Sequence, residues 1–263
     1  VGDEVFVRPH LDHRLLVDPS VGPAERLTPE PAKMPATSHE KVLDHLVVMA
    51  STLEEGVVWC EATLGVIPGP GGEHPLMGTH NRLLKINTVA GGPAYLEIIA
   101  INSVAIPAID SGARRWFDMD NLELRGMVAR NGPQLTHWVA RVPDISASIV
   151  ALAAQGIDRG AVREASRQTL NGLLQWQISV RTDGQRLFDG CLPTLIQWGD
   201  THPTDPMPDS GVTLHNLRIQ HPQADVLRQA LAATGFSKLP VANGPALLSA
   251  TLQTPKGLIE IHT

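Results

Sequence analysis

A unit of strand, helix, strand and strand occurs three times along this chain, and this repeat constrains the fold more than any other feature. The first strands of the copies are LDHLVV (43–48), LTHWVA (135–140) and LHNLRI (214–219), and the last strands include YLEIIA (95–100), LIQWGD (195–200) and LIEIHT (258–263). Self-similarity of this kind indicates that one supersecondary unit has been copied. The repeat therefore predicts an α+β fold whose units pack against one another.

Capping signals mark where the helices of these units begin and end. Ser51 or Thr52 can cap the first helix and Gly65 can end it, while Asp144 and Gly156 play these parts in the second. The predicted helical segments are 51–65, 144–156 and 222–235.

Composition divides the chain into an arm and a folded part. Residues 1–38 are Pro-rich and show no sustained period, so we expect an extended N-terminal arm; Met34 within it is a candidate translation start. The units at 41–105 and 135–200 should form one domain, residues 41–200. The third unit, 212–263, is shorter and should pack on that domain.

The bulk composition excludes several classes of function. The net charge is -6, and Arg114–Arg115 is the only adjacent pair of basic residues, so no nucleic-acid partner is expected. Two cysteines in 263 residues make no disulfide framework. Without an apolar stretch of ~20 residues or a signal peptide, we expect no membrane partner and a cytoplasmic location.

Polar side chains recur at equivalent places within the apolar strands. Placing the copies in register aligns His45 with His137, and Glu97 with Gln197. A carboxylate within AYLEIIAI is costly to bury unless it is paired or binds a metal. Taken singly, these residues are better explained as hydrogen-bonded core histidines and a paired carboxylate. Their equivalent placement in two units favours a divalent-metal site, because imidazole and carboxylate suit Zn²⁺, Ni²⁺, Mn²⁺ or Fe²⁺.

LDHLVV, LGVIPGPGGEHPLMGTHNRLLKI and YLEIIA resemble the vicinal oxygen chelate superfamily of glyoxalase I, bleomycin-resistance proteins and extradiol dioxygenases. Within it the chain is most similar to the glyoxalase-like domain proteins. The resemblance covers about residues 41–200. It implies repeated βαβββ modules that form an open, cup-shaped mixed sheet around a metal, with the helices outside.

The resemblance also implies a ligand set. Carried over by position, the metal ligands are His45, Glu97, His137 and Gln197. Gln197 departs from glyoxalase I, which has a carboxylate base there, and an amide cannot accept a proton at neutral pH. Glyoxalase I activity itself is therefore not expected.

Two further segments are candidates for binding a substrate. In the loop GEHPLMGTHN, His74, His80 and Asn81 are polar groups near flexible glycines; the alternative is a solvated loop. In the connector between the units, Arg115 and Trp116 could clamp a carboxylate-bearing substrate. The alternative is a connector helix packed by its aromatic residues.

Three functions remain open from the sequence. The first is a metal-dependent lyase or isomerase acting on a small oxygen-bearing metabolite chelated to the metal. The second is a non-haem iron dioxygenase of the ring-cleaving type, which two histidines and one glutamate would suit. The third is a small-molecule binding protein without chemistry. Two chains sharing a site as a homodimer is compatible with each of them.

Overall fold

The structure is a computed structural model that describes residues 42–89, 91–105, 112–169 and 172–263. The Pro-rich arm predicted at 1–38, with Met34, lies outside the described residues. No helix in the described part of the chain is long and apolar enough to cross a membrane.

The first module contains five elements: β1 (Val42–Met49), α1 (Leu53–Leu64), β2 (Glu73–His74), β3 (Thr79–Thr88) and β4 (Ala94–Ile101). α1 begins where predicted, because the Thr52 side chain accepts a hydrogen bond from the Glu55 N–H. It ends at Gly65, whose φ of 77° favours glycine.

The second module follows a connector that carries α2 (Leu122–Asn131). Its elements are β5 (Gln134–Arg141), α3 (Ile145–Ala153), β6 (Ala161–Thr169), β7 (Gly172–Val180), a short 3₁₀ turn (Leu187–Gly190) and β8 (Thr194–Trp198). Asp144 caps α3, as predicted, by accepting from the Ala147 N–H. The helix ends at Ala153, three residues before the predicted stop.

The third group of elements repeats the same order in a shorter span. It consists of β9 (Thr213–His221), α4 (Ala224–Ala233), β10 (Val241–Asn243), β11 (Leu247–Thr254) and β12 (Gly257–His262). The sequence did not predict β2, β6 or β10, and a connector helix such as α2 was only the alternative interpretation of its segment. β6 was missed because its sequence, AVREASRQT, is polar on both faces and becomes a strand by pairing with β7.

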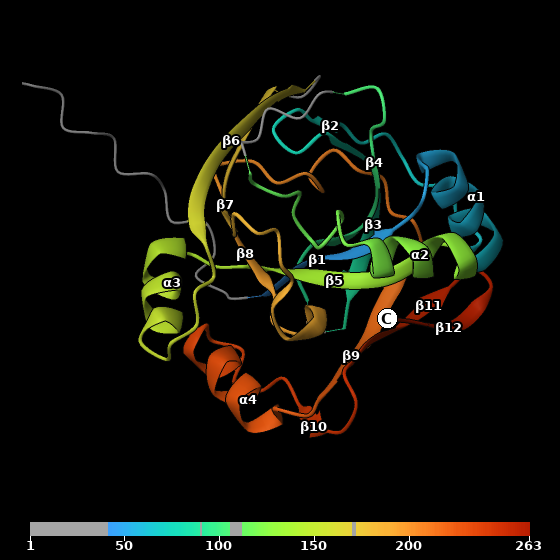
Figure 1. Cartoon of the computed structure of the whole chain (residues 1–263). Helices are drawn as coiled ribbons and strands as arrows, with labels where there is room; N and C mark the ends of the chain where they lie inside the picture. Colours follow the sequence, from blue (N-terminus) through green and yellow to red (C-terminus); the bar gives the residue numbers. More distant parts are fainter. Residues whose placement is uncertain (1–41, 90, 106–111, 170–171) are drawn as a thin grey trace, which may run out of the picture. The chain divides into compact units, whose positions relative to one another are not determined.

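The described strands join into one mixed sheet in the order β12-β11-β9-β3-β4-β1-β5-β8-β7-β6, with β10 beside β9 and β2 beside β3. β1 and β5 are antiparallel at its centre, and each has a parallel neighbour, β4 or β8, from its own module. Figure 1 shows β3 and β4 on one side of this pair and β6, β7 and β8 on the other. The predicted α+β class with repeated βαβββ modules and an open mixed sheet is confirmed.

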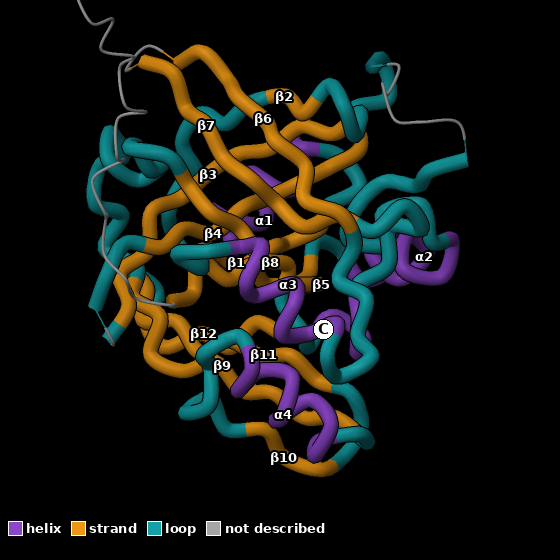
Figure 2. The backbone as a smooth tube through the Cα atoms, turned by 90° about the vertical axis from the view of Figure 1, so that its left-hand side faces the viewer, coloured by secondary structure: helices purple, strands orange, loops and turns teal. Residues whose placement is uncertain are grey.

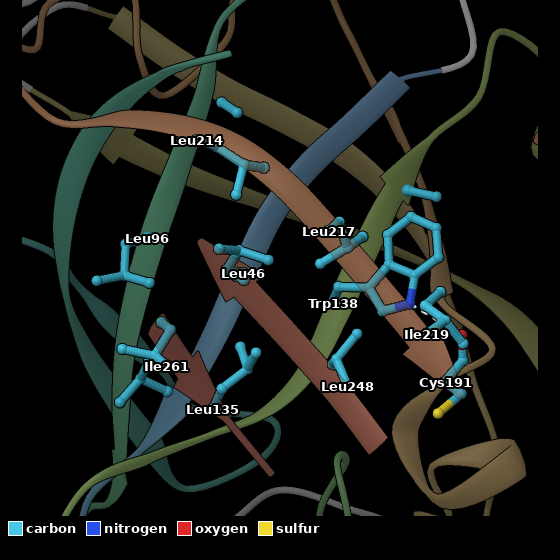
Figure 3. Packing of buried hydrophobic residues seen from close by; sticks show 14 of the residues in the cluster. Leu46, Leu96, Leu135, Trp138, Cys191, Leu214, Leu217, Ile219, Leu248 and Ile261 are labelled. Atoms are coloured by element: carbon cyan, nitrogen blue, oxygen red, sulfur yellow. Dashed lines mark hydrogen bonds between the residues drawn. The ribbon is translucent and has the colours of Figure 1, made fainter. Parts of the chain in front are cut away.

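The two faces of the central strands pack against different partners. One face, with Leu46, Leu96 and Trp138, forms the larger core, and β9 and β11 of the third module cover it (Figure 3). The other face, with Val47 and Val139, packs on the connector before α2. In the side view of Figure 2, the β6–β7 hairpin lies in front of β3 and β4.

Candidate functional site

A narrow cavity lies over the second face of the sheet, between the two modules. Its volume is about 40 Å³, enough for a small number of water molecules. The polar side chains that line it are His45, His74, Asn81, Tyr95, Glu97 and Arg167, and the aromatic ones include Trp116, Phe117, Trp176 and Trp198.

His45 projects into this cavity from β1, and two neighbouring side chains fix the position of its ring. Its Nδ1 lies 2.7 Å from Oδ1 of the buried Asp44, and Tyr95 stacks on the ring at 4.4 Å between centroids. Burial alone would raise the pKa of Asp44, but hydrogen bonds from His202 and His45 outweigh it and hold the pKa well below its usual range. Because Asp44 is ionised, His45 Nδ1 must donate the hydrogen. The other nitrogen, Nε2, is left facing the cavity.

Asp44 is the acceptor for a buried network on the same side. Its Oδ2 accepts from Nε2 of His202 at 3.0 Å and from Nε1 of Trp198 at 2.9 Å. Strand alternation alone would point Asp44 away from His45. The pairing of β1 with β5 shifts register between Leu43 and His45, and such irregularities re-aim side chains.

Glu97 faces His45 from the neighbouring strand β4. Its Oε2 lies 3.6 Å from His45 Nε2 and has no hydrogen-bond partner, although the residue is buried. Its Oε1 accepts a 2.6 Å hydrogen bond from Asn81 Nδ2. Burial raises the pKa of Glu97, against the opposing effects of His45 and Asn81. A buried oxygen without a partner, beside an oriented imidazole, is the arrangement of an acid–base pair.

Asn81 is fixed by its remaining hydrogen bonds. Its Oδ1 accepts from the Gly72 N–H at 2.8 Å, and its Nδ2 also lies 3.3 Å from Nε2 of His74. Burial, with the charge of Arg167 next, lowers the pKa of His74 to about 3, so this imidazole is neutral at physiological pH. The amide therefore holds Glu97 Oε1 and leaves Oε2 exposed to the cavity.

The register of the second module corrects the predicted position of the fourth ligand. Glu97 pairs with Val47 across β1 and β4, and the equivalent pairing across β5 and β8 joins Thr194 to Val139. Thr194, not Gln197, is thus the counterpart of Glu97. Gln197 lies on the opposite face, where its Oε1 accepts from the Ile145 N–H at the start of α3. The sequence alignment of LIQW with LEII differs from this strand pairing by three residues.

His137 does occupy the position equivalent to His45, but its nitrogens are engaged. Nε2 accepts from the Thr194 N–H at 3.1 Å and lies 3.0 Å from the Thr194 hydroxyl. Nδ1 therefore carries the hydrogen and donates to the Gly190 carbonyl at 3.1 Å. Burial and the nearby Arg159 hold the pKa of His137 well below its usual range. His137 is a hydrogen-bonded core histidine.

The donor set does not fit the four-ligand metal site that the resemblance implies. No group of three His, Cys, Asp or Glu side chains within the described ranges is arranged to hold a metal ion. His45 and Glu97 supply two donors. On the other half, the buried guanidinium of Arg159 hydrogen-bonds the Thr194 hydroxyl, and this cation disfavours a second positive charge nearby.

Three of the five predicted substrate residues meet in the cavity, and two do not. His74, Asn81 and Trp116 line it, and the His74 ring contacts the Trp116 ring edge-on at 5.0 Å. His80 alternates with Asn81 along β3 and does not line the cavity. Arg115 turns away, pairing with Asp120 at 2.6 Å. In the third unit, Asn216 and Glu260 stand at the sequence positions that correspond to His45 and Glu97, and both are exposed.

Several residues that shape the cavity were not predicted. Asp44 and His202 were missed because strand alternation and sequence distance separate them from His45. Arg167 was missed because it lies on β6, a strand without an apolar pattern. Trp176 and Trp198 had a weak signal: both lie in predicted strands with the period of two that places alternate residues on one face.

Most of the chain matches one known protein family. A model of the glyoxalase-like domain matches residues 43–235. The chain belongs to the glyoxalase-like domain family. The matched segment covers the first two modules together with β9 and α4 of the third.

Solved structures resemble this chain at low sequence identity. A hypothetical protein from Staphylococcus aureus is 13% identical over 85% of both chains, with a TM-score of 0.54. A methylmalonyl-CoA epimerase of Streptomyces coelicolor, in complex with 2-nitronate-propionyl-CoA, is 17% identical over 61% of this chain and 96% of that chain, with a TM-score of 0.36. The epimerase of Mycobacterium tuberculosis is 19% identical over 59% and 85%, with a TM-score of 0.33. No curated protein matches the chain.

Proposed function

We propose that this protein is an isomerase or lyase in which Glu97 exchanges a proton with a small oxygen-bearing metabolite. The observation that carries the proposal is the unpartnered Oε2 of Glu97, buried and facing the cavity 3.6 Å from His45 Nε2. An exposed carboxylate of ordinary pKa is a weak base, whereas burial raises the pKa of Glu97 toward physiological pH.

Each neighbour then has a role in the proton transfer. Glu97 Oε2 removes a proton from a carbon next to a carbonyl or carboxyl group, and the electron pair of the C–H bond moves onto the substrate oxygen. Return of the proton to another position or face gives an isomerase; departure of a group from the adjacent carbon gives a lyase. His45 Nε2 shares the proton with Glu97, and Asp44 fixes the imidazole tautomer.

Solvent exchange tests this proposal across a panel of candidate substrates. Small 2-oxo, 2-hydroxy and dicarboxylic acids are incubated with the protein in D₂O, and loss of the C–H signal is followed by proton NMR. The wild type should catalyse exchange in at least one of them, and Glu97→Gln should lower that rate at least 100-fold. Exchange at an unchanged rate in Glu97→Gln would refute the assignment of the base.

The same assay, repeated after dialysis against a chelator, addresses the metal. If a divalent ion takes part, His45 and Glu97 are the protein residues that would hold it, with the remaining positions left to substrate or water. Chelation would then abolish exchange, and adding the ion back would restore it. We expect exchange to survive chelation, because the proposed proton transfer uses only Glu97 and His45.

A small-molecule binding protein without chemistry is the second candidate. The aromatic walls of the cavity favour it, since Trp116, Trp176 and Trp198 offer apolar surface to any planar ligand. It predicts ligand binding with no exchange in any compound. The iron dioxygenase is disfavoured, because it needs His137 as a third ligand and both nitrogens of that ring are engaged.

A further inference from the structure

We infer that the cavity takes a carboxylate, held by the guanidinium of Arg167 and the indole N–H of Trp116. This inference deepens the proposed function by naming the substrate class of the same cavity, and it rests on that function only for the reacting atom. It starts from polar groups in the cavity wall that lack a protein partner.

Two such groups are hydrogen-bond donors. Nε1 of Trp116 is buried and has no hydrogen-bond partner. The guanidinium of Arg167 lines the cavity from β6 and, among the described residues, makes no ion pair or hydrogen bond. A buried N–H left unpaired is costly, so the Trp116 donor favours a ligand with acceptor oxygens, and the half-buried Arg167 adds a positive charge to the same cavity wall. A planar guanidinium matches the two oxygens of a carboxylate.

The charges around these donors suit an anion. His74, which contacts Trp116 and feels the charge of Arg167, has a pKa of about 3 and is therefore neutral. Glu97 lines the same cavity with an unpartnered oxygen, and it feels the positive charge of Arg167. A carboxylate bound at Arg167 would therefore lie in the same cavity as the base.

The loop after α1 is shaped to admit Arg167. A Cβ on Gly72 would overlap Nη1 of Arg167, so only glycine at this position lets the guanidinium reach the cavity wall. The overlap involves the end of a flexible side chain, and Gly72 does not have a positive φ. An alanine at position 72 should therefore displace Arg167 while the fold stays intact.

Gly69 offers a matched control in the same loop. A Cβ there would meet only the Leu83 carbonyl oxygen at 3.4 Å, an ordinary contact. Gly69→Ala should behave like the wild type, whereas Gly72→Ala should resemble loss of the arginine.

Binding of small acids and their amides tests the inference. Formate, acetate and lactate are titrated against formamide, acetamide and lactamide by calorimetry and by tryptophan fluorescence, since three tryptophans line the cavity. At least one acid should bind the wild type ten times more tightly than its amide. Arg167→Gln and Gly72→Ala should abolish that preference, Trp116→Phe should weaken acid binding several-fold, and Gly69→Ala should change nothing.

Failure of this inference is distinguishable from failure of the proposed function. Equal binding of acids and amides by the wild type, or an acid preference retained in Arg167→Gln, would overturn the carboxylate site. Glu97→Gln should bind the acid at least as tightly as the wild type, because a facing negative charge is removed, while proton exchange is lost. If exchange fails everywhere but the acid preference follows Arg167, the carboxylate site stands and the base is wrong.

Discussion

Replacing Asp44 with Asn should destabilise the protein more than any other single change of a polar group in the cavity network. The carboxylate is fully buried and accepts hydrogen bonds from His45, His202 and Trp198. An amide can keep the His202 and Trp198 bonds by placing its oxygen where Oδ2 lies. Its NH₂ group then faces His45 Nδ1, which must give up its hydrogen and adopt the other tautomer.

The magnitude follows from the bonds that change. Three hydrogen bonds to a buried charge contribute about 1.5–3 kcal/mol each, whereas the three neutral bonds that replace them, including the amide N–H to the unprotonated His45 Nδ1, contribute about 0.5–1.5 kcal/mol each. Asp44→Asn should therefore lower the free energy of unfolding by about 3–5 kcal/mol, in line with the breaking of other buried ion pairs. With a typical domain stability of about 5–15 kcal/mol, the variant should still fold.

The effect should depend on pH with a defined sign. The pKa of Asp44 is depressed in the folded state, so its stabilisation is complete above about pH 4, the ordinary pKa of an aspartate in an unfolded chain. The difference between wild type and Asp44→Asn should shrink as the pH falls below that value toward the folded pKa. Urea unfolding at pH 7, 4 and 3 measures this difference directly.

Asp144→Asn is the matched control. Asp144 is exposed and caps α3, and Asn is an equally good N-cap, so its stability should change by only a few tenths of a kcal/mol. Asp44→Asn could instead lower the free energy of unfolding by less than about 1 kcal/mol at pH 7, or its difference from the wild type could grow toward acid pH. Either result would refute an ionised, buried Asp44 at the centre of the hydrogen-bond network.

Three further changes test the rest of the site by urea unfolding. Glu97→Gln should leave the protein at least as stable at pH 7, because its raised folded-state pKa means that ionisation costs stability above about pH 4; lower stability at pH 7 would contradict this. Gln197→Glu should change the free energy of unfolding by less than about 1 kcal/mol and leave metal content unaltered, because its carboxylate would still accept from the Ile145 N–H at the positive end of α3. Tighter metal binding in this variant would show that position 197 belongs to a metal site. Thr194→Val should cost about 1–3 kcal/mol, because it leaves the buried Arg159 with one partner fewer; an unchanged midpoint would show that the hydroxyl is dispensable.

The repeat in the sequence was sufficient for the fold class, and most strand and helix positions, because apolar strands and capped helices are local signals. The predicted segments YLEIIA and LIQWGD coincide with β4 and β8 to within two residues at each end. His45 and Glu97 were also within reach of sequence reasoning. Each is a polar residue in an otherwise apolar strand, and their recurrence in the repeat indicated a shared site.

Tertiary structure alone decided which groups complete the site. Strand register made Thr194 rather than Gln197 the counterpart of Glu97, and register depends on pairing between strands that no local pattern records. An irregularity in β1 lets the Asp44 side chain contact His45. The polar strand β6 places Arg167 in the cavity wall. These contacts join residues far apart in the chain or break strand alternation, so only the packed fold reveals them.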